Sequence, residues 1–67
     1  MTVLVNGEPR LLEPGTTVEA LVRTLVEEPE RGVAVALDRE VLPRRAWGET
    51  TLRDGQEIEV LQAVAGG

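Results

Sequence analysis

The first dozen residues predict a β-hairpin. Thr2 to Val5 is rich in β-formers, and Asn6-Gly7 follows it, the dipeptide best suited to the positive φ angles of a type I′ turn. The returning strand is expected over Glu8 to Leu12. Because proline cannot donate a ladder hydrogen bond, Pro9 favours the edge of a sheet for this strand. Pro14-Gly15 ends the hairpin.

An amphipathic helix is expected next. Its apolar residues recur at spacings of three and four, the pattern of a helix that buries one face: Val18, Leu21, Val22, Leu25 and Val26. Thr16 stands three residues before Glu19, so we expect these two side chains to cap the first turn reciprocally. Pro29 disfavours helical geometry at the residue before it, which predicts that the helix ends near Glu27.

The second half of the chain is expected to supply the remaining strands. Val33 to Leu37 alternates large and small apolar residues, as a strand does when its bulky side faces a core. After a polar turn at 38–40, Val41-Leu42 is expected to form a short strand. The segment from Arg44 to Thr51 is expected to be irregular, and Glu57 to Val64 is the predicted last strand.

One apolar helix face and several half-apolar strands combine most simply in a mixed sheet with the helix laid across one side. By analogy of element order, this predicts the α+β class and the β-grasp (ubiquitin-like) architecture, with four to five strands and one main helix across one face. We expect a single domain over residues 1–64. Ala65-Gly66-Gly67 is too poor in side chains to pack, so a flexible tail is expected at 65–67.

Charge and length narrow the range of functions. The chain has 67 residues, with twelve acidic side chains against seven basic ones and a formal net charge of -5. This charge repels phosphate backbones, and Trp47 is the only aromatic residue that could stack on a base, so nucleic-acid binding is not expected. No stretch approaches the roughly 20 apolar residues that span a bilayer, and the start of the chain lacks a signal-peptide pattern. We therefore expect a cytoplasmic protein that does not bind membranes.

Catalysis by side chains of this chain is not expected. The sequence has no Cys and no His, which removes disulfides, the usual zinc sites and the commonest catalytic side chains other than carboxylates. Nothing indicates that two carboxylates converge for acid-base work. So short a chain also leaves no room for a buried cofactor. The expectation is a protein that is not an enzyme, with no catalytic residue, no metal and no bound cofactor.

The Gly66-Gly67 end is the main candidate for chemistry. If Glu57 to Val64 is the final strand, these glycines project from the sheet, and without a Cβ they could enter a narrow slot. A terminal carboxylate that attacks the α-phosphate of ATP gives an acyl-adenylate, which sulfur or nitrogen can attack. Because the chain has no Cys, any sulfur that it carries must be on that terminal carbonyl, as a thiocarboxylate. The alternative is a frayed terminus without a role.

Strand alternation also turns some apolar side chains away from the expected core. In the last strand, Leu61 and Ala63 fall on the face opposite Ile58. Leu4 is opposite Val3 in the same way, and it would lie close to Leu61 if the first and last strands pair. The two exposed leucines, together with Ala63, suggest a docking patch for a partner. The alternative is that they are isolated surface residues without a role.

Several segments, in this order, carry a family resemblance: Val5-Asn6-Gly7-Glu8, Thr17-Val18 with Leu21 and Leu25, Val35-Ala36-Leu37 with Val41 and Pro43-Arg44, Trp47, Leu52 with Asp54-Gly55, Ile58-Glu59-Val60 and Ala63-Val64-Ala65-Gly66-Gly67. Together they resemble the ThiS family, the sulfur carrier proteins of thiamine thiazole biosynthesis, over nearly the whole chain. Asp38 stands where these proteins often have asparagine, and aspartate also tolerates a turn.

The resemblance implies a ubiquitin-like carrier whose Gly67 carboxylate is adenylated by an E1-like adenylyltransferase that consumes ATP. Sulfur from a cysteine desulfurase or sulfurtransferase relay then converts the carboxylate to a thiocarboxylate, and thiazole synthase takes this sulfur for the thiazole ring. The same resemblance implies that Val64, Ala65 and Gly66 enter the partner enzymes ahead of Gly67. The outer face of the sheet around Leu61 would dock against them.

Two other functions are compatible with the sequence. Sibling carriers that deliver sulfur to a molybdopterin precursor or to transfer RNA share the fold and the Gly-Gly end. The Asn6-Gly7-Glu8 opening and the Pro43-Arg44 pair followed by Trp47 favour the thiazole carrier. The other alternative is a β-grasp module that binds partners non-covalently and has an idle tail.

Overall fold

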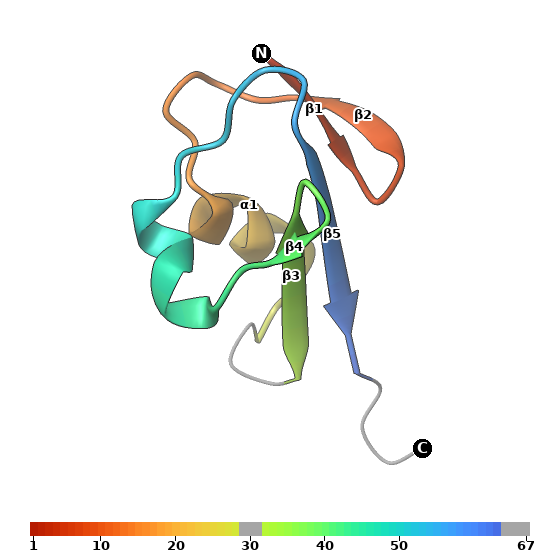
Figure 1. The fold of residues 1–67 in the computed structure, drawn as a ribbon, viewed down its shortest axis with the longest axis vertical. Coiled ribbons are helices and arrows are strands. Elements are labelled where there is room, and N and C mark those ends of the chain that lie inside the picture. The colour runs from red at the N-terminus through yellow and green to blue at the C-terminus, as the bar shows by residue number, and fades with distance from the viewer. Residues whose placement is uncertain (29–31, 64–67) are drawn as a thin grey trace.

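The computed structural model describes residues 1–28 and 32–63, and these form one sheet with a helix on one side of it (Figure 1). The elements in chain order are β1 (Thr2–Val5), β2 (Glu8–Leu11), α1 (Val18–Leu25), β3 (Val33–Leu37), β4 (Glu40–Val41), η1 (Arg44–Glu49) and β5 (Glu57–Gln62). The sheet has five strands in the order β2-β1-β5-β3-β4. The predicted mixed sheet with one main helix across one face is confirmed.

The first and last strands of the chain lie side by side at the centre of this sheet. β1 and β5 run parallel, with Leu4 beside Glu57 and Val5 beside Ile58. The other neighbouring strands are antiparallel. β2 and β4 are the edge strands, so the edge position that Pro9 predicts for β2 is confirmed.

The core lies between α1 and the sheet. Its buried residues come from both layers: Val3, Val5, Val18, Leu21, Val22, Val26, Val35, Trp47, Leu52, Ile58 and Val60. The helix period therefore identified the buried face of α1 correctly. Trp47 is 3% exposed, and its indole N–H donates a 3.0 Å hydrogen bond to the carbonyl of Leu42. Burying one large apolar side chain stabilises the fold by about 1.5 to 3 kcal/mol.

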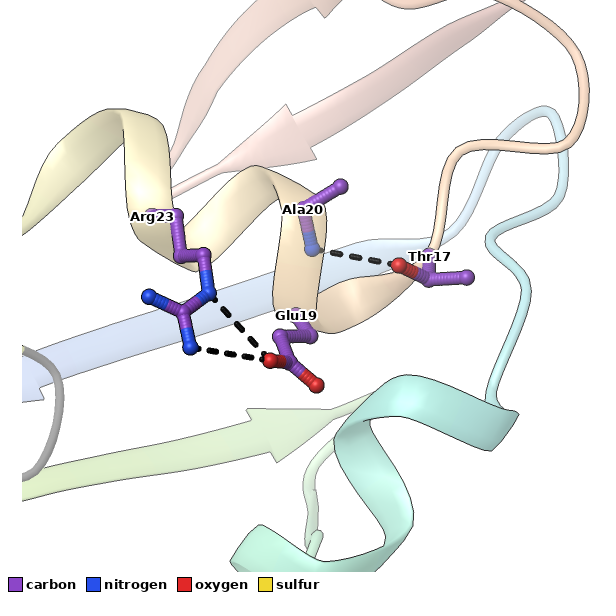
Figure 2. A network of polar contacts seen from close by, with 4 residues as sticks. All are labelled: Thr17, Glu19, Ala20 and Arg23. Atoms are coloured by element: carbon purple, nitrogen blue, oxygen red, sulfur yellow. Dashed lines mark hydrogen bonds and ion pairs between the residues drawn. The ribbon is translucent and has the colours of Figure 1, made fainter.

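The start of α1 differs from the expected capping box (Figure 2). Thr17 is the N-cap, and its hydroxyl oxygen accepts a 3.1 Å hydrogen bond from the backbone N–H of Ala20. Glu19 does not reach back to the cap, because its carboxylate accepts hydrogen bonds from Arg23 at 3.1 and 3.2 Å. The predicted Thr16–Glu19 capping box is therefore wrong. The N-cap is Thr17, one residue later than predicted, and Glu19 does not take part in the cap.

Hydrogen bonds to the segment before β5 explain why α1 starts one residue later than the sequence predicts. The backbone of Thr16 and Val18 is held by the segment before β5: Leu52 donates to the Thr16 carbonyl and Val18 donates to the Thr50 carbonyl, both at 2.9 Å. These bonds keep Thr17 extended, with ψ at 163°. Helical geometry can therefore begin only after Thr17. At the other end, α1 stops at Leu25, two residues before the expected end.

The segment from Arg44 to Thr51, expected to be irregular, contains the 3₁₀ helix η1. Burial of Trp47 anchors this helix to the core. η1 packs near the start of α1, since a Cβ built at Gly48 would come within 2.8 Å of the Oε1 atom at the end of the Glu19 side chain. So short a helix has no apolar period of its own in the sequence, which explains why the pattern missed it.

Strand ends also differ slightly from expectation. The turn between β3 and β4 is shorter than 38–40, because only Asp38 and Arg39 adopt positive φ, at 49° and 71°, and Glu40 already pairs with Leu37. β4 therefore ends at Val41 rather than at Leu42. β2 ends at Leu11 and β5 at Gln62. The predicted end of the last strand, Val64, lies outside the described residues, as does the expected tail at 65–67.

Candidate functional site

The candidate site is the helix-free face of the sheet together with the end of β5. Along β5, Ile58 and Val60 are buried against the core, whereas Leu61 has 66% of its surface exposed. Leu61 lies beside Ala34 of β3 in the antiparallel register. The predicted facing of Leu61, away from the core, is confirmed.

Leu4 and Leu61 share the helix-free face without being neighbours. Leu4 is half-buried and lies beside Glu57, which is four residues before Leu61 on the same strand. At about 3.3 Å per residue, this offset separates the two leucines by about 13 Å along β5. The expectation that pairing of the first and last strands would bring them close is therefore wrong, because the parallel register places Leu4 at the start of β5.

Ala63, the third residue expected in the docking patch, is exposed. Its backbone N–H donates a 2.8 Å hydrogen bond to the carbonyl of Gly32. Gly32 has a φ of 61°, and a Cβ on it would come within 3.1 Å of the Ala63 Cβ. The positive φ of Gly32 and its close approach to Ala63 both favour a glycine at this position.

Asn6 holds β5 on its other side. Its side-chain oxygen accepts a 2.8 Å hydrogen bond from the Val60 N–H, and its amide nitrogen donates to the Val60 carbonyl at 3.3 Å. Its backbone N–H donates to the Ile58 carbonyl at 2.9 Å. The Asn6 side chain thus continues the β1–β5 ladder beyond the point where the main chain of β1 turns away. The sequence pattern predicted only a turn at Asn6, because Val60, which its side chain contacts, lies 54 positions later in the chain.

Asp38 fastens the start of β5 to the β3–β4 turn. Its carboxylate accepts hydrogen bonds from the Glu57 backbone N–H and from the Gln56 side-chain amide, each at 3.0 Å. These two donors stabilise the charged form and hold the pKa of Asp38 below its ordinary value. The expectation that an aspartate tolerates this turn is confirmed by its positive φ.

The body of the domain offers little side-chain chemistry. Across residues 1–28 and 32–63, no polar or charged side chain is buried and no group of three or more metal-ligating residues comes together. A hollow on the helix-free face is lined by Leu4, Gly7, Arg39, Glu57, Ile58 and Glu59. In this same part of the chain, no helix is long and apolar enough to cross a membrane.

The residues predicted to carry sulfur and to enter the partner enzymes, Val64, Ala65, Gly66 and Gly67, lie outside the described residues. The Asn6 side chain on one side and the Gly32 carbonyl on the other hydrogen-bond to this last segment, so the strand that leads toward these residues is held up to residue 63. The site therefore consists of a firmly held last strand and a sheet face free of helices.

These features define the class of the protein. A five-stranded mixed sheet with parallel first and last strands and one helix across it is the β-grasp arrangement of ubiquitin-like proteins. The model of the ThiS family matches residues 3–67. The chain belongs to the ThiS family.

Individual relatives agree with this assignment. The chain is 42% identical over 65 residues to a sulfur carrier protein ThiS of Thermus thermophilus, a match that covers 97% of this chain and 98% of the relative. The crystal structure of a thiamine biosynthesis protein (ThiS) from Geobacter metallireducens has a TM-score of 0.82 at 37% identity and covers all of both chains. A thiazole synthase of Magnetococcus marinus is 39% identical over 67 residues, but this chain spans only 20% of its length.

Proposed function

We propose that this chain is the sulfur carrier for thiazole formation in thiamine biosynthesis, and that Gly67 carries the sulfur. The observation that carries this proposal is the match to the ThiS family over residues 3–67, which includes Gly66-Gly67. The fold supports it, since a compact domain with a firmly held last strand suits a protein that presents its chain end to other proteins. The chain itself is then a co-substrate of its partners and not an enzyme.

The chemistry of the proposal takes place at the Gly67 carboxylate. A carboxylate oxygen attacks the α-phosphate of ATP, pyrophosphate leaves, and an acyl-adenylate forms. A persulfide on the sulfur donor attacks the carbonyl carbon and AMP leaves, which gives an acyl disulfide. A thiol of the partner enzymes then attacks the donor's cysteine sulfur, the S–S bond to the acyl sulfur breaks, a disulfide forms on the partner side, and the Gly67 thiocarboxylate is released. ATP is consumed by the activating enzyme, and no cofactor is bound by this chain.

Three kinds of partner follow from this proposal. An E1-like adenylyltransferase activates Gly67, a cysteine desulfurase or sulfurtransferase relay supplies sulfur, and thiazole synthase takes it. The thiazole synthase partner is supported by the relative from Magnetococcus marinus, in which a segment similar to this chain belongs to a protein of that name. Val64, Ala65 and Gly66 are proposed to enter these enzymes, and the face with Leu61, Leu4 and Ala63 to dock. The proposed setting is the cytoplasm, with no role for nucleic acid or a membrane.

Mass spectrometry tests the proposal directly. Incubation with the cognate activating enzyme, ATP and a sulfur donor is expected to add the mass difference between one sulfur and one oxygen, and fragmentation is expected to locate it at Gly67. A chain that lacks Gly66-Gly67 is the control and should keep its mass. An unchanged mass of the full chain with an enzyme that is demonstrably active would contradict the proposal and favour a non-covalent interaction module.

A further inference from the structure

The turn between β1 and β2 carries a pair of residues with a chemistry of its own, Asn6-Gly7 (Figure 1). An asparagine before a glycine can lose its side-chain amide without an enzyme, because the backbone nitrogen of the glycine attacks the amide carbon of the asparagine. Glycine obstructs this attack least, since it has no Cβ. Asn6 is the only asparagine of the sequence, so deamidation of this type is confined to this turn.

The structure leaves the attacking nitrogen accessible. Asn6 and Gly7 are both exposed, and nothing lies within 4 Å of a Cβ built on Gly7. The Gly7 backbone N–H donates no hydrogen bond to any group of residues 1–28 and 32–63. Attack requires this nitrogen to lose its proton, and solvent can reach the proton directly. The nucleophile is therefore available in the folded chain.

Asp54-Gly55 provides a comparison within the same molecule. An aspartate before a glycine can form the same cyclic imide, with loss of water in place of ammonia. Here the Gly55 N–H donates a 2.8 Å hydrogen bond to the Thr2 carbonyl, and the Asp54 carboxylate accepts one of 2.7 Å from the Thr2 N–H. Both the attacking nitrogen and the attacked group are held by the same residue. Of the two pairs, the structure therefore favours reaction at Asn6-Gly7.

The fold restrains the other reactant, the side-chain amide of Asn6. Its oxygen accepts a 2.8 Å hydrogen bond from the Val60 N–H, and its nitrogen donates to the Val60 carbonyl at 3.3 Å. These two bonds hold the plane of the amide against β5. Attack makes the planar amide carbon tetrahedral and expels the nitrogen, so the side chain must first leave Val60. The reaction then proceeds from the fraction of molecules in which this contact is open.

We propose that Asn6 is a site of spontaneous deamidation, that opening of its contact with Val60 sets the rate, and that deamidation weakens the hold of the β1–β2 turn on β5. The Gly7 nitrogen bonds to the amide carbon, the bond from that carbon to the amide nitrogen breaks, and ammonia leaves with the proton given up by Gly7. Water then opens the resulting succinimide at either carbonyl. One product is an aspartate, and the other is an isoaspartate, in which the main chain runs through the former side chain.

Both products lose the N–H donor that the Val60 carbonyl has in the unmodified chain. A carboxylate oxygen takes the place of the amide nitrogen, and two acceptors that face each other repel. The isoaspartate also adds a backbone atom to a two-residue turn, so Val5 and Glu8 can no longer pair in the same geometry. Since β5 leads toward residues 64–67, the modification acts on the strand next to the proposed reactive end.

Incubation of the full chain in mildly alkaline buffer tests the site and its control by the fold. Peptide mass spectrometry should find the mass difference between a hydroxyl and an amino group at Asn6, and a protein isoaspartyl methyltransferase used as a probe should label position 6 and not position 54. The rate in guanidinium chloride above the unfolding midpoint should exceed the rate in buffer by about tenfold or more, since only open molecules react. Asn6→Gln is the matched control and should keep its mass, because its longer side chain cannot form the same ring.

The stability of the product tests the effect on β5. Ion exchange separates the deamidated chain by its additional negative charge, and its melting temperature should be lower by about 4 to 8 °C, the shift expected for one lost hydrogen bond in so small a domain. Asn6→Asp should shift it in the same direction. Equal melting temperatures would overturn the weakened hold on β5, equal rates with and without denaturant would overturn the control by the fold, and an unchanged mass in both would overturn the site. No partner enzyme takes part, so these results do not depend on the proposed function.

Discussion

At the scale of single residues, Asn6 combines two structural roles that no other residue type provides equally well. Its φ of 50° lies in the left-handed region, where asparagine is better tolerated than most residues. Its side-chain amide also replaces the missing main chain of β1 as the partner of Val60. The residue therefore closes the hairpin and holds the last strand at the same time.

Substitutions of Asn6 can separate these two roles. Asn6→Gly keeps the left-handed backbone and loses both side-chain hydrogen bonds, which we expect to lower the free energy of unfolding by about 1 to 2 kcal/mol. Asn6→Ala adds strain of about 1 kcal/mol at positive φ and should be the less stable variant. Urea denaturation followed by circular dichroism measures both. If Asn6→Gly is as stable as the unmodified chain, the bonds to Val60 contribute nothing to folding.

At the scale of elements, the start of α1 shows how a distant contact selects between two local solutions. Thr16 and Thr17 are both good N-cap residues, and the sequence favours Thr16 through the Glu19 that follows three residues later. The backbone hydrogen bonds between Thr16 and Leu52 and between Val18 and Thr50 select Thr17 as the N-cap. Only the folded chain brings these segments together.

The two threonines form a matched pair for testing this assignment. Thr17→Ala removes the N-cap acceptor for the Ala20 N–H and is expected to cost about 1 kcal/mol of stability. Thr16→Ala removes only an exposed hydrogen bond to the Glu13 carbonyl and should cost less. Thermal melts of the two variants show which substitution lowers the melting temperature more. The reverse order would restore the capping box that the sequence suggested.

At the scale of the whole molecule, the sheet has one face that packs on α1 and an opposite face for which contact with partners is proposed. The side that packs on α1 holds the buried residues of β1, β3 and β5, whereas the opposite side carries the large exposed apolar side chains of Leu11, Val41 and Leu61. A chain of 67 residues has a folding margin of only about 3 to 5 kcal/mol. Changes on the two faces should therefore have very different consequences.

The same substitution at two leucines tests this division. Leu21→Ala, on a side chain that is 2% exposed, is expected to cost about 2 to 5 kcal/mol and to leave much of the chain unfolded. Leu61→Ala, on a side chain that is 66% exposed, should keep the melting temperature within a few degrees, by the small effect of surface substitutions. Circular dichroism on heating compares them. A collapse of the melting temperature in Leu61→Ala would show that Leu61 belongs to the core.

The sequence by itself determined the elements whose information is local. The spacing of Val18, Leu21 and Val22 identified the buried face of the helix, and Asn6-Gly7 located the first hairpin. The two-residue period assigned Ile58 and Leu61 to opposite faces of β5 correctly. These features follow from one turn or one strand at a time, so no distant residue is needed to predict them.

The tertiary structure alone decided everything that depends on residues far apart in the chain. It set the parallel register that separates Leu4 from Leu61, folded residues 44–49 around the buried Trp47, and joined Asn6 to Val60. It also gathered Val41 and Leu61 beside two alanines, which no local pattern indicates. The physical reason is that register and packing are fixed by contacts between distant segments, and those contacts exist only once the chain has folded.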